Sequence, residues 1–434
     1  MSTTARSPLS RRRFLAAAGI AAGMAAATGC AKGTGTVAAT KNTITSAAWV
    51  DPITDVIYGP IAKGFAAKSG VTLQPQASVA FADYQTRWRT LLAGGQPPDI
   101  LEVNDDFVAE VTNKKLTQDL TPYLQKSKIN TSDFFEKPFN FTKRGDTQRA
   151  MSIGSLARCI IYNKTMFKEE GIPLPPTTWT DDGWKWDDFL SAAKALTKGS
   201  TTWGAVVVKD TAYENTFCLN NGGVGTFSAD GKKFTLADGP GVEALQWVYD
   251  LTLKHKVTPA YGDIQADGAE QRLFAGGKLG MLFAPSSAIA YYAENVKDFE
   301  WDIAPVPGNQ HQFQEGGQIV YTIPEKAKNP DHAWDFLNYI ISPEGGKVLA
   351  EAGLVVPINK KAAESLTSPG KYPKNIKLFV DAQDHSKPIN FSAGTAAAVA
   401  IYRPQLQRAI TGEITAKQAL TAARSQVEAA LAST

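Results

Sequence analysis

The chain has 434 residues, of which 43% are hydrophobic and 20% charged, a composition that excludes general disorder and collagen-like sequence. The 45 Lys and Arg residues outnumber the 42 Asp and Glu residues, but four arginines and no acid precede Cys30. Without residues 1–29 the chain would hold 41 basic and 42 acidic residues, so its net charge of +3 would become −1 and gives no reason to expect an acidic partner.

Residues 1–29 have the pattern of an export signal. A basic stretch precedes 16 apolar or small residues, fewer than the roughly 20 that a membrane-spanning helix needs. Ser10–Leu15 resembles a twin-arginine export motif, and Ala27–Cys30 resembles a bacterial lipobox. We therefore expect a twin-arginine-like signal peptide over 1–29, lipidation of Cys30 and a lipid-anchored tether over 30–42. A general secretory signal without lipidation is the alternative, and no later segment predicts a transmembrane helix.

Short apolar runs alternate with helical patterns after the tether. Apolar side chains recur every three or four residues where helices are expected, and glycine or polar residues separate these stretches from the expected strands. Strands are expected over 43–50, 71–79 and 99–103, with helices over 54–68, from Tyr84 to Leu92 and over 106–113. Strands and helices that alternate with short connections predict a parallel α/β sheet, whose strand ends are common ligand sites.

The second half of the chain is richer in helical patterns. Cys159 and Cys218 lie there in apolar surroundings, which favours two buried thiols over a disulfide, although their pairing stays open. Proline and glycine punctuate this half without isolating one linker, which suggests lobes built from interleaved segments. Helices are expected after Trp186, from Val242 to Thr252, after Asn329-Pro330, and from the Thr415–Gln418 capping pattern to Leu431.

The sequence lacks patterns for catalysis, cofactors and metals. Its four histidines are far apart and have no zinc-site spacing, and it has no nucleophile elbow, Walker A motif or dinucleotide-binding fingerprint. The pairs Asp105-Asp106 and Asp181-Asp182 could serve a glycosidase, but paired acids at a helix start are usually caps. A basic stripe with interleaved aromatics is also missing, so nucleic acid is not an expected partner. These observations predict a binding protein without catalytic residues, metal or cofactor.

Ten short segments match, in order, the landmarks of one protein family. They are Pro98–Leu101, Leu116–Leu124, Ile161–Gly171, Pro176–Trp179, Trp186–Phe189, Phe274–Met281, Ala304–Gly308, Gly316-Gly317, Ala333–Leu337 and Gly412–Leu420. In these segments the chain resembles the extracellular solute-binding lipoproteins of bacterial ABC importers, family 1, which contains the maltose- and oligosaccharide-binding proteins.

The resemblance implies an α/β protein with the two-lobed periplasmic-binding-protein fold (type II), in which hinge strands join the lobes and a solute binds in the cleft between them. The first lobe would comprise 43–153 and 314–353, and the second 154–313 and 354–434. The protein would be a monomer that captures a mono- or oligosaccharide and delivers it to permease subunits. It would lie on the outer face of the cytoplasmic membrane as a lipoprotein, or in the periplasm.

The family pattern also implies positions for ligand contacts. They are Trp49 and Asp51 after the first strand, Asn104 and Asp105 after the third, Ser155 and Arg158 at the first lobe crossing, Tyr213 and Asn221 beside a helix, Phe283 and Ser286 near a strand end, and Gly317 and Gln318. Trp49 could instead be a core aromatic, and Arg158 a hinge salt-bridge residue. Ser286 follows a proline after which the family commonly has Trp, so a close match in sugar specificity is not expected.

Two further functions stay open at this point. A secreted carbohydrate-active enzyme would need a credible acid pair, which the sequence does not present. A binding protein for a non-sugar solute, or a lipoprotein whose partner is another protein, would differ in the lining of its cleft. The sequence does not name the sugar, the permease or the ATPase.

Overall fold

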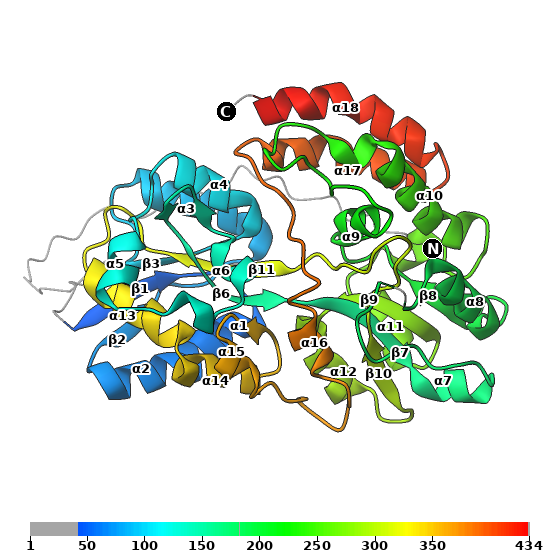
Figure 1. Cartoon of the computed structure of the whole chain (residues 1–434), viewed down its shortest axis with the longest axis horizontal. Helices are drawn as coiled ribbons and strands as arrows, with labels where there is room; N and C mark the ends of the chain where they lie inside the picture. The colour runs from blue at the N-terminus through cyan, green and yellow to red at the C-terminus, as the bar shows by residue number, and fades with distance from the viewer. Residues whose placement is uncertain (1–41, 182, 433–434) are drawn as a thin grey trace, which may run out of the picture. The chain divides into compact units, whose positions relative to one another are not determined.

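The computed structural model describes residues 42–181 and 183–432 (Figure 1). The expected signal peptide, the lipidation site Cys30 and the tether up to residue 41 lie outside these residues. Among the described helices, none is both long and apolar enough to cross a membrane. The described chain forms two lobes, each built on one larger β-sheet.

The first lobe contains a six-stranded sheet in the order β12-β6-β11-β3-β1-β2. The β1 strand pairs in parallel with β2 and β3, as the sequence predicts, but β11 pairs antiparallel with β3 and β6. The sheet is therefore mixed, and the expectation of a parallel sheet is wrong for this half because β11 enters from the other lobe. The strands are β1 Thr43–Ala47, β2 Thr72–Pro75, β3 Ile100–Val103, β6 Met151–Leu156, β11 Gly317–Thr322 and β12 Val356–Pro357.

Two apolar clusters hold helices against this sheet. One contains Phe65 and Trp334, and the other contains Trp88 and Phe107. The helices of the first lobe are α1 Pro52–Val56, α2 Ala62–Ser69, α3 Phe81–Ala93, α4 Asp105–Asn113, α5 Thr121–Lys126, α6 Glu136–Asn140, α13 Pro330–Ile341, α14 Pro343–Glu351 and α15 Lys360–Ala363, and a small hairpin joins β4 Lys143–Arg144 to β5 Thr147–Gln148.

The helix expected over 54–68 is present as one continuous stretch. It runs from α1 through a π-helical turn at Ile57–Ile61 into α2. Asp51 caps its start by accepting the N–H of Ile53, and Gly70 ends it with a φ of 72°, a left-handed conformation that glycine adopts at little cost. The cap places Asp51 directly after the loop that follows β1.

The second lobe contains a four-stranded sheet in the order β10-β7-β9-β8. Its core includes Trp179, Trp184 and Trp186, which the sequence shows as a cluster. The strands are β7 Arg158–Asn163, β8 Trp203–Val206, β9 Leu279–Pro285 and β10 Trp301–Ala304, and the helices are α7 Lys164–Glu169, α8 Trp186–Leu196, α9 Tyr213–Asn220, α10 Gly239–Leu253, α11 Ala269–Ala275, α12 Ile289–Asn295, α16 Leu378–Asp381, α17 Thr395–Ile410 and α18 Ala416–Ala432.

The chain passes between the two sheets more than once. Ala157 alone separates β6 from β7, and residues 305–316 lead from β10 to β11 (Figure 1). The β12 strand still pairs with β6, and α15 packs against α14. The first sheet therefore continues past residue 353, where the sequence places a lobe boundary.

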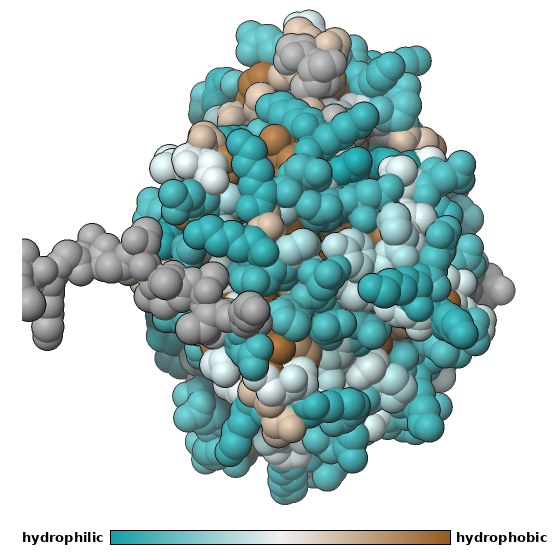
Figure 2. Space-filling view, turned by 90° about the vertical axis from the view of Figure 1, so that its left-hand side faces the viewer, coloured by the Kyte–Doolittle hydropathy of each residue, from teal (hydrophilic) through white to brown (hydrophobic). Residues whose placement is uncertain are grey.

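The polarity of the surface and the burial of the two described cysteines are those expected of a folded protein. On the first-lobe face shown in Figure 2, hydrophilic residues predominate and hydrophobic ones are scattered among them. Cys159 and Cys218 are both buried free thiols, which confirms the expectation of two buried thiols.

Candidate functional site

Residues of both lobes line a pocket of about 270 Å³, which we call the aromatic pocket. The first lobe contributes residues from the loop after β1, the start of α3, the residue before α4, and β11. The second lobe contributes α9, the segment that leads to α17, and α17 itself. The lining residues are Trp49, Phe81, Asn104, Leu156, Arg158, Thr211, Glu214, Asn215, Thr226, Glu315, Gly317, Gln318, Ile319, Ile389, Phe391, Val399, Tyr402 and Arg403.

Two aromatic rings form the first-lobe wall of the aromatic pocket. Trp49 packs edge-to-face against Phe81 and Tyr84, with ring centroids 5.3 and 5.2 Å apart. The Tyr84 hydroxyl donates to the backbone oxygens of Ala47 and Glu102, which ties this aromatic group to β1 and β3. Trp49 is 8% exposed and belongs to a core cluster, whereas Phe81 is 51% exposed. Trp49 is thus a core aromatic and a pocket residue at once.

Glu214 of α9 is the buried acid of the opposite wall. It accepts a hydrogen bond from the Tyr402 hydroxyl at 2.6 Å and lies 3.4 Å from Nε of Arg403. Burial raises the pKa of Glu214, and the nearby Arg403 and Tyr402 oppose this rise. Asn215 beside it accepts the N–H of Thr226 at 2.8 Å. This wall therefore holds polar groups in fixed positions within hydrogen-bonding reach of the pocket.

A second pocket, of about 490 Å³, shares Arg158 and Thr211 with the aromatic pocket, and we call it the charged pocket. Asp51 lines it from the first lobe, and Lys209, Asp210 and Glu270 line it from the second. Burial raises the pKa of Asp51, and the charge of Asp55 adds to this rise. Its other lining residues include Phe283, Pro285, Ser287, Tyr291 and Tyr292.

Arg158 lies where the two pockets meet. Its Nε donates to Oδ2 of Asp210 at 3.1 Å, and its Nη1 donates to the backbone oxygen of Glu315 at 3.1 Å. Both partners of the Arg158–Asp210 pair have side chains that are 13% exposed. Arg158 is therefore a salt-bridge residue at the lobe crossing, and it also borders the space open to a ligand.

Glu102 lies behind the first-lobe wall on β3 and is 1% exposed. Burial raises the pKa of its carboxyl well above the ordinary value, and the charge of Asp51 adds to the rise. A hydrogen bond from the backbone of Trp49 opposes the rise. The Glu102 carboxyl thus contacts the turn after β1, which carries the pocket residues Trp49 and Asp51.

Seven of the predicted ligand contacts line one of the two pockets. At Gly317 the Arg158 side chain comes close to the backbone, so that a Cβ there would lie 2.8 Å from Nη1 of Arg158 and the guanidinium would have to shift. The predicted residues in the aromatic pocket are Trp49, Asn104, Arg158, Gly317 and Gln318, and those in the charged pocket are Asp51 and Phe283, with Arg158 shared.

The other predicted contacts lie elsewhere. Ser155 is buried and donates to Oε1 of Gln383 at 2.5 Å, and Ser286 is buried and donates to the backbone oxygen of Leu354 at 3.1 Å. The Tyr213 hydroxyl lies 3.1 Å from that of Tyr249, and Nδ2 of Asn221 donates to the backbone oxygen of Pro240 at 2.9 Å. None of these four is among the residues that line either pocket. Asp105 is the first residue of α4, and its side chain lies outside the described part of the chain.

The family pattern places Tyr213 and Asn221 beside helix α9, whereas the residues of α9 that line the aromatic pocket are Glu214 and Asn215. Successive helical residues point about 100° apart, so Glu214 and Asn215 line the pocket while the adjacent Tyr213 packs into the core. Phe391 and Arg403 have no local signal, since they reach the pocket from the C-terminal segment, more than 150 residues after α9 along the chain. Phe81 could have been suspected from the sequence as a pocket residue only because it is a large apolar residue next to an expected helix start.

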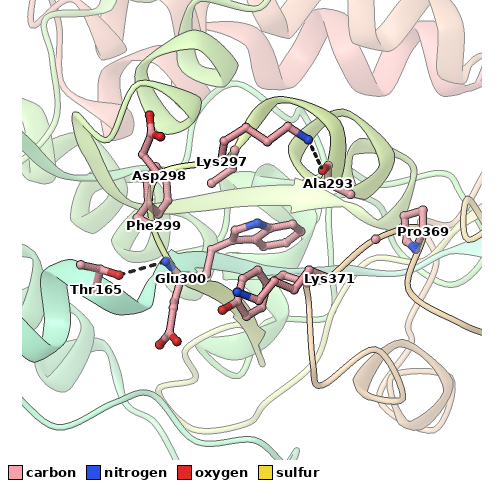
Figure 3. A pocket seen from close by; sticks show the side chains of 12 residues that line it. Thr165, Ala293, Lys297, Asp298, Phe299, Glu300, Pro369 and Lys371 are labelled. Atoms are coloured by element: carbon pink, nitrogen blue, oxygen red, sulfur yellow. Dashed lines mark hydrogen bonds between the residues drawn. The ribbon is translucent and has the colours of Figure 1, made fainter.

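Other pockets lie apart from these two. One, of about 560 Å³, is lined by residues 296–301, which lead into β10, and by residues 369–372 (Figure 3). At its edge Thr165 Oγ1 accepts the N–H of Glu300 at 2.9 Å, and Lys297 Nζ donates to the backbone oxygen of Ala293 at 3.4 Å. It contains none of the predicted site residues. Over residues 42–181 and 183–432, no group of three or more His, Cys, Asp or Glu residues could hold a metal ion.

Known structures share this architecture. An ABC substrate-binding protein of Listeria monocytogenes, in complex with cycloalternan, has a TM-score of 0.79 and 22% identity over 89% of this chain and 98% of that one. A solute-binding protein of Thermotoga lettingae bound with α-D-tagatose has a TM-score of 0.75 and 20% identity over 90% of this chain and 100% of that one. The cyclic α-maltosyl-1,6-maltose binding protein of Arthrobacter globiformis has a TM-score of 0.73 and 20% identity over 90% of this chain and 98% of that one. These likenesses confirm the predicted two-lobed fold.

Comparisons of the amino-acid sequence identify the protein family. Proteins of Brucella abortus and Brucella suis that are named only as binding proteins are 23% identical over 225 residues. The match covers 49% of this chain, and the chain spans about half the length of these curated relatives, 51%. A family model for bacterial extracellular solute-binding proteins matches residues 48–347, which confirms the resemblance found in the sequence. The chain belongs to the family of bacterial extracellular solute-binding proteins.

Proposed function

We propose that this protein is the extracellular solute-binding subunit of an ABC importer and that its solute is a sugar. The observation that carries the proposal is the aromatic pocket, to which both lobes contribute. A solute that contacts both walls favours the arrangement in which the lobes close on it, and this is how binding would be signalled to the permease subunits.

The chemistry of the pocket walls suits a sugar. The apolar C–H faces of a pyranose ring pack on aromatic rings, and Trp49 and Phe81 offer such rings on one wall. Glu214, Asn215 and Gln318 supply acceptors and donors for hydroxyl groups, each of which needs a partner when it is buried. Structural neighbours carry cycloalternan and tagatose, which supports the choice of solute class.

The charged pocket gives room for a solute with more than one ring. It shares the lining residues Arg158 and Thr211 with the aromatic pocket and so lies next to it. Asp51 and Glu270 face it from opposite lobes and would accept hydroxyl donors. The residues proposed as ligand contacts are Trp49, Asp51, Asn104, Asp105, Arg158, Phe283, Gly317 and Gln318 from the family pattern, with Phe81, Glu214 and Asn215 added from the pocket.

The lobe assignment and the location are part of the same proposal. The first lobe would comprise 43–153 and 314 to about 363, which extends the boundary expected at 353 because β12 pairs with β6. The second lobe would take the remainder. The chain would be exported by a twin-arginine-like signal and held at the outer membrane face by lipid on Cys30, where it would act as a monomer.

A sugar screen tests the proposal. Thermal melts of the exported chain with mono- and oligosaccharides should identify a stabilising sugar, because a ligand at 100 times its Kd adds about 2.7 kcal/mol to the free energy of unfolding. Calorimetry with that sugar should then show weaker binding for Trp49→Ala and unchanged binding for Tyr213→Phe, whose hydroxyl faces the core. Silence across sugars together with a response to peptides or polyamines would reject a sugar as the solute.

A further inference from the structure

Three segments meet at the passage between the lobes, and we call them the hinge segments. They are residues 155–158, 314–317 and 382–387. The third contacts the first lobe as well as the second, because Lys137 of α6 donates to the backbone oxygen of Asp384 at 2.6 Å. The chain passes between the lobes in the first two segments, so a movement of one lobe against the other has to bend them, and it also changes the contacts of the third.

Gln314 is hydrogen-bonded to both of the other hinge segments and is 0% exposed. Its Oε1 accepts the backbone N–H of Arg158 at 3.0 Å, and its Nε2 donates to the backbone oxygen of Ala382 at 3.2 Å. Its own backbone bonds to the third segment on both sides: the Gln314 N–H donates to His385, and the Gln314 oxygen accepts from Lys387, each at 3.0 Å. One side chain thus connects all three hinge segments.

The hydrogen bonds around Gln314 extend to residues that line the ligand pockets. Arg158, whose backbone Gln314 holds, lines both pockets, and its guanidinium donates to the backbone oxygen of Glu315. The Glu315 N–H donates to Oγ1 of Thr216 in α9 at 3.0 Å, and α9 carries the pocket residue Glu214. Gln314 itself lines neither pocket.

We propose that Gln314 is a positioning residue that makes the three hinge segments move as one unit and so sets how the lobes close on the solute. The physical reason is that its side chain is buried and its bonds join segments that are distant along the chain. An apolar residue in its place would remove the Oε1 acceptor of the Arg158 N–H and one of the two donors to the Ala382 oxygen, which also accepts the His385 N–H, and this favours local rearrangement of the hinge. This proposal rests on the proposed function only in the part of its test that measures affinity for sugar.

Gln312 provides a matched control two residues away. It is also buried, at 1% exposed, and its side chain makes the same kinds of bond. Its Oε1 accepts the N–H of Thr180 at 2.7 Å, and its Nε2 donates to the backbone oxygen of Val306 at 3.0 Å. Both partners belong to the second lobe, so Gln312→Leu removes equivalent bonds without disconnecting the hinge segments.

The test measures the distance between the lobes and the affinity for sugar in Gln314→Leu and Gln312→Leu. Dyes on cysteines placed at the exposed Lys126 and Lys232 report single-molecule energy transfer between the lobes in a Cys30→Ser chain. Cys159 and Cys218 are buried and do not compete for the dyes. We expect both variants to melt earlier than the parent chain, and only Gln314→Leu to broaden or shift the sugar-free distance distribution.

Affinity gives the second readout. We expect the Kd for the best sugar of the screen to rise about tenfold in Gln314→Leu and to stay within about twofold in Gln312→Leu. If Gln314→Leu does not fold, Gln314→Met tests the same loss with a flexible side chain of similar length. Equal distance distributions in the two variants would overturn the proposal. Because that measurement needs no sugar, it can fail or succeed independently of the proposed function.

Discussion

Replacing Phe81 by Ala should weaken sugar binding more than any other single change of an exposed residue at the aromatic pocket. Phe81 begins α3, lines the pocket and packs edge-to-face on Trp49. It is 51% exposed, whereas most large apolar side chains of the described chain are buried. An exposed aromatic ring at a pocket wall is surface that a ligand can remove from water.

The size of the effect follows from the exposed area. A phenylalanine side chain has roughly 200 Å² of surface, so the 51% exposed fraction of Phe81 corresponds to about 100 Å². Covering all of it at about 25 cal/mol per Å² would contribute about 2.5 kcal/mol to binding. A sugar ring that covers only one face of Phe81 would contribute about half as much to binding. Phe81→Ala should therefore raise the Kd by roughly tenfold to sixtyfold.

Isothermal titration calorimetry with the best sugar of the screen measures this change. Leu174→Ala is the matched control, because Leu174 is also partly exposed, at 41%, but lines neither pocket. Each substitution removes a half-buried apolar side chain and should lower the free energy of unfolding by about 1–2 kcal/mol. Only Phe81→Ala should change the Kd.

The reasoning from exposed area has a clear refutation. If Trp49→Ala abolishes binding of a sugar whose Kd changes less than twofold in Phe81→Ala, the ligand does not cover Phe81. The exposed ring would then need another explanation, and the first-lobe wall would act through Trp49 alone.

Three further substitutions test the electrostatics and the helix orientation. Relative to the parent chain, Glu102→Gln should stabilise the protein increasingly as pH rises from 5 to 8. The reason is that folding raises the pKa of the Glu102 carboxyl, so the carboxyl contributes stability below its unfolded pKa and loses it as pH rises through the folded pKa. A difference in melting temperature between the two chains that is constant across this range would contradict the argument. Glu214→Gln should lower the free energy of unfolding by about 1–2 kcal/mol and weaken sugar binding, because it breaks the pair with Arg403, and chemical denaturation with calorimetry would detect both effects. Tyr213→Phe should cost about 1 kcal/mol of stability through its lost contact with Tyr249 and leave the Kd unchanged; a raised Kd would mean that Tyr213 reaches the solute after all.

The sequence by itself determined the local structure of the first lobe up to about residue 113. Apolar periodicity and glycine stops predicted the strands around β1, β2 and β3 and the helices between them, because these elements depend on neighbours a few residues away. The order of family landmarks predicted the two-lobed fold. The direction of β11 was not predictable in this way, since it depends on where a chain that has built the second lobe re-enters the first sheet.

Only the tertiary structure decided which side chains share a pocket. Trp49 lies at the end of a predicted strand and Gln318 follows a family landmark, so both could be selected from the sequence. Phe391 and Arg403 come to the same pocket from the C-terminal segment. On helix α9 the sequence suggests Tyr213, but the adjacent Glu214 lines the pocket, because successive helical residues point in different directions. A sequence pattern records which residues are near each other along an element, but a cleft between lobes is made by contacts between elements, and these are fixed only when the hinge segments bring the two sheets together.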